Sequence, residues 1–501
     1  MAISTEIQRL QGAKASLKTS IENKGVTVPA ATKIDGYAAL VDQISGGGGD
    51  APSSYDAVRL FDYDGTLLYS YSAADFANLT AMPANPSHTG LTAQGWNWSL
   101  ADAKTYVAAH GYLEIGQSYI TTDGKTRAYF SFPQGTARLT LTIDIYQSVA
   151  NGVTINWGDG SATETIASSN EQTATHTYPS AGDYVIEFDV AEGCTFSLGS
   201  YNCFIRETDT MFAMNMALKK VELGARCRDI GNYSATTSYN GISGLETISI
   251  PKGITDYAYR GGVNFCSALK AIVLPEGMTN DTSYSFSGTY SLRILSLPKS
   301  WTKMPNLNNS GVERLTLPEN YYTAQQSTLS SAINLRVLIL PSGFTNIADL
   351  FRGLTRLEVL KLPSTVTTIA DRAFEQTQQL QQIDIPSGVT SIGNNFLSTA
   401  GIQVLTIPDR VSTIGNAFSS YRCLTKLVIG SGITSIGTAF TTVTSLKEVH
   451  IKATTPPTLS ASAFSSMPSD CVIYVPSASL TSYQTASNWL AFADKIVAET
   501  A

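Results

Sequence analysis

Residues 380–393 read Leu380-Gln-Gln-Ile383-Asp-Ile385-Pro386-Ser-Gly388-Val389-Thr-Ser-Ile392-Gly393. Alternating aliphatic residues predict a short strand with one buried face, and the proline ends that strand because it cannot donate to a sheet. A glycine turn and a second aliphatic pair follow. The same pattern starts at eleven positions from Leu218 to Leu446, 20 to 27 residues apart. A single copy cannot bury its own core, so the repetition predicts a stack of copies that share one.

The repeats also carry a recurrent Ala-Phe pair, as in the copy from Leu424 to Phe440. Together these residues resemble the BspA-like class of leucine-rich repeats. The resemblance implies a solenoid, which we place at residues 194–470. A cap at 471–501 is expected to close it, with a final strand at Cys471–Pro476 and an amphipathic helix at 482–496.

The residues between the buried strand positions are expected to face outward in two rows along the sheet. Several are apolar and have charged neighbours, which is typical of an interaction surface. Ordinary filling by residues with high β-propensity, or cover by a neighbouring domain or subunit, would give the same pattern. The candidate binding residues are Ile294, Arg314, Val337, Ile339, Val359, Lys361, Gln382, Asp384, Val404 and Lys426.

Residues 133–193 form the preceding segment. It contains Val153-Thr-Ile-Asn-Trp157-Gly-Asp-Gly-Ser161, His176-Thr-Tyr178 and Asp183-Tyr-Val-Ile186. These stretches resemble a polycystic-kidney-disease-type (PKD) Ig-like domain. The resemblance implies a β-sandwich with Trp157 in its core and a role as a spacer or adhesion module. It favours a structural role for Asp159 and His176 over metal binding or acid–base chemistry.

A small α+β module is predicted at residues 55–132. It has turns at Asp64-Gly65 and Asp123-Gly124, each between two expected strands. Two serines, Ser72 and Ser99, are placed to cap helices. Trp96 and Trp98 lie between those helices and predict either a core plug or a platform on which a sugar stacks.

The stretch from Phe61 to Leu67 resembles the DxDGT motif of haloacid-dehalogenase-like phosphatases, through Asp62 and Asp64. That chemistry also needs a phosphate-binding Ser or Thr, a lysine and a later acidic pair on a parallel α/β sheet. We find no later acidic pair and too little strand–helix alternation for such a sheet. A turn is therefore favoured over a phosphatase site.

Residues 1–45 predict a helical segment, joined by a glycine-rich linker at 46–54. Its apolar residues recur at coiled-coil spacing. They predict a local helical hairpin or an attachment and oligomerisation seam. The seam residues are Ile3, Ile7, Leu10, Leu17 and Ile21. The segment resembles the attachment segments of phage tail-associated proteins, and the α+β module resembles one found in such proteins.

Composition excludes several classes of function. The 501 residues are 43% hydrophobic and 15% charged, with a net charge of −7. This composition is not that of a disordered chain or a nucleic-acid binder, and no apolar run approaches the 18 residues of a membrane span.

The first 21 residues lack a signal-peptide core, so we expect a cytosolic protein or one released by lysis or another signal-independent route. The six cysteines form no CxxC pair and predict buried thiols, with a Cys194–Cys203 disulfide as the alternative.

The fold class expected is therefore multidomain and mainly β: a helical segment, an α+β module, a PKD-like sandwich and a leucine-rich-repeat solenoid. No nucleophile–base pair or metal cluster is found, so no enzyme, cofactor or metal is predicted. The leading hypothesis is a homo-oligomeric, for example trimeric, phage tail-fibre protein of the virion. Its N-terminus would dock on other tail proteins and its solenoid would bind a host receptor, protein or glycan. The alternatives are a bacterial surface or secreted adhesin, and a structural baseplate or head component.

Overall fold

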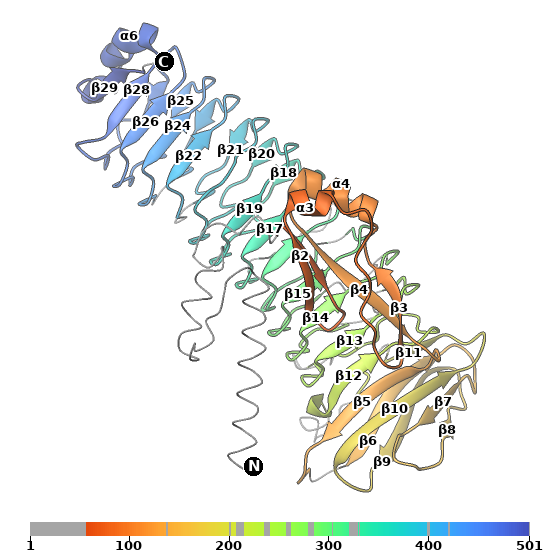
Figure 1. Cartoon of the computed structure of the whole chain (residues 1–501). Helices are drawn as coiled ribbons and strands as arrows, with labels where there is room; N and C mark the ends of the chain where they lie inside the picture. The colour runs from red at the N-terminus through yellow and green to blue at the C-terminus, as the bar shows by residue number, and fades with distance from the viewer. Residues whose placement is uncertain are drawn as a thin grey trace, which may run out of the picture.

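The computed structural model describes residues 57–136, 139–199, 202–206, 215–234, 241–256, 262–278, 285–302, 304–319, 329, 331–397, 401–418 and 421–499. The segment predicted at 1–45, with Ile3, Ile7, Leu10, Leu17 and Ile21, and the linker at 46–54 lie outside these residues. The described chain forms a small α+β module, two β-sheets and a long solenoid (Figure 1).

The α+β module contains one four-stranded sheet and two helices. Its elements are β1 (Val58–Phe61), β2 (Leu67–Tyr71), α3 (Ala73–Ala77), β3 (Leu91–Trp96), α4 (Leu100–His110) and β4 (Leu113–Thr121). The strand order is β2-β1-β4-β3, with β1 antiparallel to β2 and parallel to β4. The predicted hairpin at Asp64-Gly65 is confirmed. Ser72 and Ser99 also cap α3 and α4 as predicted, each accepting a hydrogen bond from the backbone three residues on.

Two β-sheets follow the module. Their strands are β5 (Thr126–Phe132), β6 (Thr140–Gln147), β7 (Val153–Asn156), β8 (Glu164–Thr165), β9 (Asn170–Thr177), β10 (Gly182–Val190) and β11 (Phe196–Leu198). One sheet contains β5-β10-β7-β8 and the other β11-β6-β9. They share a core, because the ring of Phe188 on β10 lies 5.2 Å from that of Phe196 on β11. The PKD-type assignment of this region stays a prediction.

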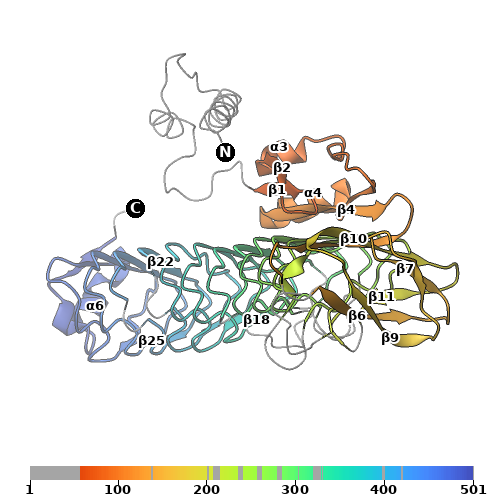
Figure 2. The ribbon, with the colours of Figure 1, turned by 90° about the horizontal axis from the view of Figure 1, so that it is seen from below.

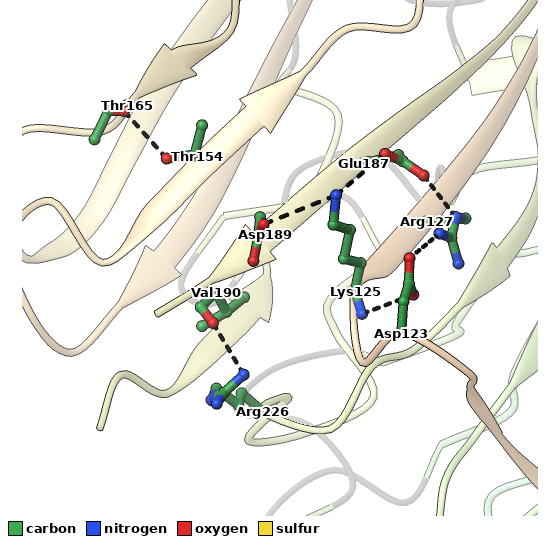
Figure 3. Close-up of polar contacts among 9 residues, drawn as sticks. All are labelled: Asp123, Lys125, Arg127, Thr154, Thr165, Glu187, Asp189, Val190 and Arg226. Carbon is green, nitrogen blue, oxygen red and sulfur yellow. Dashed lines mark hydrogen bonds and ion pairs between the residues drawn. The ribbon is translucent and has the colours of Figure 1, made fainter. Parts of the chain in front are cut away.

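The expected boundary at residue 132 is wrong. The strand predicted to follow Asp123-Gly124 within the module is β5, and it pairs with β10 rather than with β4. The other edge of β5 pairs with the first solenoid strand, β12 (Leu218–Glu222). One sheet therefore runs from this region into the solenoid. Figure 3 shows the polar seam beside it, where Lys125 bridges Glu187 and Asp189.

The solenoid stacks one short strand per repeat in the predicted register. After β12 the ladder strands are β13 (Thr247–Ser249), β14 (Ala271–Val273), β15 (Ile294–Ser296), β16 (Arg314–Thr316), β17 (Val337–Ile339), β19 (Val359–Lys361), β22 (Val404–Ile407), β24 (Lys426–Ile429), β26 (Glu448–Ile451) and β28 (Val472–Val475). Arg314 pairs with Val337, which pairs with Val359. The repeat at 380–385 has no strand at this place, although its Ile383 is buried.

A second ladder comes from the aliphatic pair that follows each glycine turn. Its strands are β18 (Asn346–Ile347), β20 (Thr368–Ile369), β21 (Ser391–Ile392), β23 (Thr413–Ile414), β25 (Ser435–Ile436) and β27 (Thr458–Leu459). The phenylalanines of the Ala-Phe pairs stack between these turns. The rings of Phe418 and Phe440 lie 5.1 Å apart and those of Phe440 and Phe464 lie 5.4 Å apart, nearly parallel in both pairs. The Ala-Phe recurrence is thus a column of buried rings.

The C-terminal cap differs from its prediction. Instead of a helix at 482–496, the chain forms η3 (Ser477–Ser479), α6 (Leu480–Thr485), η4 (Leu490–Phe492) and a last strand, β29 (Ile496–Ala498). The helix ends before Asn488, whose φ of 64° is left-handed. Trp489 is fully buried, and its Nε1 donates to the Pro457 carbonyl at 2.8 Å. β29 pairs parallel with β28, so the cap extends the ladder by one strand.

All six cysteines are free thiols, so the alternative Cys194–Cys203 disulfide is not formed. Cys194, Cys203, Cys266 and Cys471 are buried, as predicted, whereas Cys227 is half-buried and Cys423 exposed. Burial raises the pKa of the Cys471 thiol to about 11, which keeps it protonated at neutral pH.

Candidate functional site

The α+β module lies on the outward sheet face of the first solenoid repeats (Figure 2). Ser249 donates to the Tyr119 carbonyl at 3.3 Å, and Ser296 donates to the Glu114 carbonyl at 2.9 Å. Gly116 of β4 faces Val273 so closely that an added Cβ would lie 2.3 Å from a Val273 methyl. Only glycine permits this approach.

Side-chain donors of the module also form hydrogen bonds with the backbone carbonyls of the residues that directly follow three successive ladder strands, β14, β15 and β16. Asn97 Nδ2 donates to Leu274 at 2.9 Å, Trp98 Nε1 to Leu297 at 2.8 Å and Tyr106 Oη to Leu317 at 2.7 Å. Each acceptor directly precedes the proline of its repeat. The module is therefore docked in register with the repeats.

This docking corrects part of the predicted binding surface. Ile294 is only 7% exposed and packs with Phe61. Arg314 is also 7% exposed, and its Nε lies 3.6 Å from Glu114 Oε1. Val337 and Ile339 are buried as well. The expectation that these four residues face solvent is wrong. For Ile294 and Arg314, the reason is cover by a neighbouring domain.

The outward face is accessible further along the solenoid. Val404 is 51% exposed, and Lys361, Gln382 and Asp384 are exposed while Val359 and Lys426 are half-buried. We use the name open face for the outward residues from Val359 to Tyr474. Of the predicted binding residues, the six named in this paragraph lie on it.

The open face also contains an ion-pair cluster of which only Lys426 was predicted. Lys426 Nζ lies 2.8 Å from Glu448, and His450 contacts Glu448 at 3.1 Å and Glu499 at 2.9 Å. The His450 ring stacks on Tyr474 at 4.6 Å. Glu448, His450 and Tyr474 occupy the same outward positions in the next two repeats, so extending the two rows would have found them. Glu499 follows the last strand and lies outside the rows.

Trp96 and Trp98 are buried, as the core-plug alternative predicts. Trp96 Nε1 donates to the Pro83 carbonyl at 2.9 Å. Both tryptophans nevertheless border a cavity of about 540 Å³ between the module and the solenoid. Its charged lining residues are Asp102 from the module and Lys252, Glu276 and Lys299 from the solenoid. None of these four residues was predicted. For the three solenoid residues, the signal is a charged residue directly after the proline of successive repeats.

The aspartates considered for catalysis have structural partners. Asp64 accepts from the Thr66 amide at 2.9 Å, as a turn residue does, and Asp62 contacts His88 at 2.8 Å. His176 contacts Asp159 at 2.7 Å and stacks on Trp157. Hydrogen bonds from Ser161 and His176 lower the pKa of Asp159 to about 2. These contacts tie the turn at Asp159 to the strand that carries His176.

Two kinds of feature are absent from the described part of the chain. Within the ranges given above, no three His, Cys, Asp or Glu side chains are grouped so that they could hold a metal ion. No helix in that part of the chain has both the length and the apolar character needed to cross a membrane.

One known protein family matches the repeat region of this chain. The family described as "BspA type Leucine rich repeat region (6 copies)" matches residues 239–351 and 348–469. Residues 239–469 are BspA-type leucine-rich repeats. The open face is thus the outward sheet surface of BspA-type repeats. No curated protein matches this chain.

Solved structures of leucine-rich repeat proteins are similar to part of this chain. A leucine-rich repeat protein from Bacteroides ovatus is 20% identical, with a TM-score of 0.40, over 57% of this chain and 82% of that one. The pneumococcal vaccine antigen PcpA is 17% identical, with a TM-score of 0.28, over 57% and 85%. A leucine rich cell surface protein from Faecalibacterium prausnitzii is 18% identical, with a TM-score of 0.24, over 56% and 84%.

Proposed function

We propose that this protein is a non-enzymatic adhesin that binds a macromolecular partner on the open face of its BspA-type repeats. The observation that carries the proposal is the half-covered outward sheet. The module occupies the first repeats, whereas Val404 and its neighbours are accessible. A repeat stack offers an extended surface of this kind because each repeat adds one strand beside the last.

The composition of the open face suits a protein interface. Val359, Val404 and Val428 supply apolar contacts, and Lys361 and Asp384 supply charged groups beside them. Interfaces of moderate affinity combine an apolar centre with a polar rim in this way. The stacked pair of His450 and Tyr474 adds aromatic surface, which is enriched where binding energy concentrates.

A bacterial surface or the extracellular space is the setting that we propose. The tail-protein hypothesis depends mainly on residues 1–45, which lie outside the described residues, and no comparison supports it. The bacterial adhesin, first an alternative, is therefore preferred. A virion component without a receptor would have no use for an accessible open face.

The test is binding of the fluorescently labelled full-length protein to a panel of epithelial and bacterial cells, measured by flow cytometry. Val404→Glu places a charge at the centre of the open face, and we expect at least tenfold weaker binding to the responsive cell type. The matched control is Val149→Glu, because Val149 is 49% exposed and lies on the loop after β6. Equal binding by both variants, or no binding to any cell, would overturn the proposal.

A further inference from the structure

Four successive repeats carry a charged residue directly after the proline that ends the ladder strand. They are Lys252, Glu276, Lys299 and Glu319. Stacked repeats are spaced by roughly 4.8 Å, so these side chains form a row of alternating charge along one edge of the solenoid. The row lies beside the α+β module.

Two members of this row contact acidic or histidine side chains at the two ends of helix α4. Lys299 pairs with Asp102 in the first turn of the helix, and Glu319 contacts His110 at its last residue. The helix therefore lies along the edge of the solenoid. The other two members, Lys252 and Glu276, border the cavity, which Lys299 also lines.

Lys252 forms no ion pair within the part of the chain that the structure describes. Among the described residues no carboxylate lies within ion-pair distance of its ammonium group, which sits 3.5 Å from the place where a Cβ on Gly95 would be. Burial lowers the pKa of this ammonium. The charge of Glu276 offsets this loss of hydration only in part, and an anionic ligand in contact with the ammonium would offset it further.

The rest of the cavity restricts the kind of anion. Its volume of about 540 Å³ lies within the range of about 300–1,000 Å³ that is typical of small-molecule sites. Lys299 also lines the cavity but is paired with Asp102, and Glu276 adds a further negative charge, which disfavours a dianion such as phosphate. Carboxylates instead accept hydrogen bonds from hydroxyl groups. Met82 and Trp96 give the cavity an apolar wall.

We propose that this cavity binds an acidic sugar, a hexose ring with a single carboxylate. Lys252 pairs with the sugar carboxylate, Glu276 accepts hydrogen bonds from ring hydroxyls, and the apolar C–H face of the ring lies against Met82 and Trp96. The site is separate from the open face and would give the protein a second, small-molecule specificity.

The experiment is isothermal titration calorimetry of the full-length protein with glucuronate, glucose and acetate. We expect glucuronate to bind at least tenfold more tightly than either of the others, because only it has both the carboxylate and the ring. Lys252→Gln should weaken glucuronate binding at least tenfold. The control Lys361→Gln removes an exposed lysine of the open face and should leave glucuronate binding unchanged.

Acetate binding as tight as that of glucuronate would overturn the sugar assignment. Unchanged glucuronate binding by Lys252→Gln, or no binding by the wild type at millimolar concentration, would overturn the site. Circular dichroism checks that the Lys252 variant is folded. Val404→Glu should keep full glucuronate affinity, so a failure of the open-face proposal is distinguishable from a failure of this one.

Discussion

Replacing Asn97 by alanine should loosen the module from the solenoid by an amount that the structure defines. Asn97 is fully buried. Its Oδ1 accepts from the Gly116 amide at 3.0 Å, and its Nδ2 donates to the Leu274 carbonyl at 2.9 Å. Alanine leaves a buried amide and a buried carbonyl without these partners. At about 1–3 kcal/mol for each orphaned group, the cost is about 2–6 kcal/mol.

Hydrogen exchange measured by mass spectrometry is the assay, because it reports local opening. A cost of about 3 kcal/mol corresponds to exchange that is about 160-fold faster, since RT is about 0.59 kcal/mol. We expect this acceleration in peptides that cover β4 and β14, on the two sides of the docked surface. The repeats from Val404 onward should exchange as in the wild type, because they do not contact Asn97.

The matched control is Gln382→Ala, which removes an exposed amide from the open face. It should change exchange by less than fivefold everywhere. Acceleration below fivefold in Asn97→Ala would refute the reasoning, because the orphaned groups would then cost less than about 1 kcal/mol. Equal acceleration along the whole solenoid would refute it too, because the docked surface would then not be a local unit.

Three further predictions concern the other parts of the fold. The pKa of Asp159 is about 2, below its ordinary value of about 3.9; its carboxylate therefore stabilises the fold above pH 4, and this contribution is lost as the pH falls through 2. Asp159→Asn should accordingly melt below the wild type at pH 7 but not at pH 2, and a gap that persists at pH 2 would contradict this. Phe418→Ala should cost about 3–5 kcal/mol in urea denaturation, because a fully buried ring leaves the stacked column; a loss below 1 kcal/mol would argue against the column. Trp489→Phe should cost about 1–3 kcal/mol, because the buried Pro457 carbonyl loses its donor, and should speed exchange in β28 and β29; unchanged exchange there would show that the bond is dispensable.

Features that depend on a few neighbouring residues were predictable. The alternation around Arg314, Val337 and Val359 gave the ladder register, and these residues pair as the spacing required. Ser72 and Ser99 cap their helices because a serine can bond the amide three residues on. The cap helix was overextended because Asn488, which stands beyond the end of α6 in a left-handed conformation, carries no stronger signal than any other asparagine.

Features that depend on distant partners were not predictable. β5 follows a turn that is typical of a hairpin, yet its neighbours are β10 and β12, about 60 and 90 residues further on. For the same reason, the sequence did not reveal the cavity that Lys252 and Glu276 border.

By itself, the sequence determined that residues 239–469 are a stack of BspA-type repeats, where most of the ladder strands lie and which residues face outward. Those properties follow from alternation, proline and glycine within a single repeat. Only the tertiary structure decided which part of the outward face is accessible. The covering contacts join residues as far apart as Asn97 and Ser296, 199 positions along the chain. No local pattern encodes a contact of that range, because it depends on the shape and donors of two surfaces that form separately.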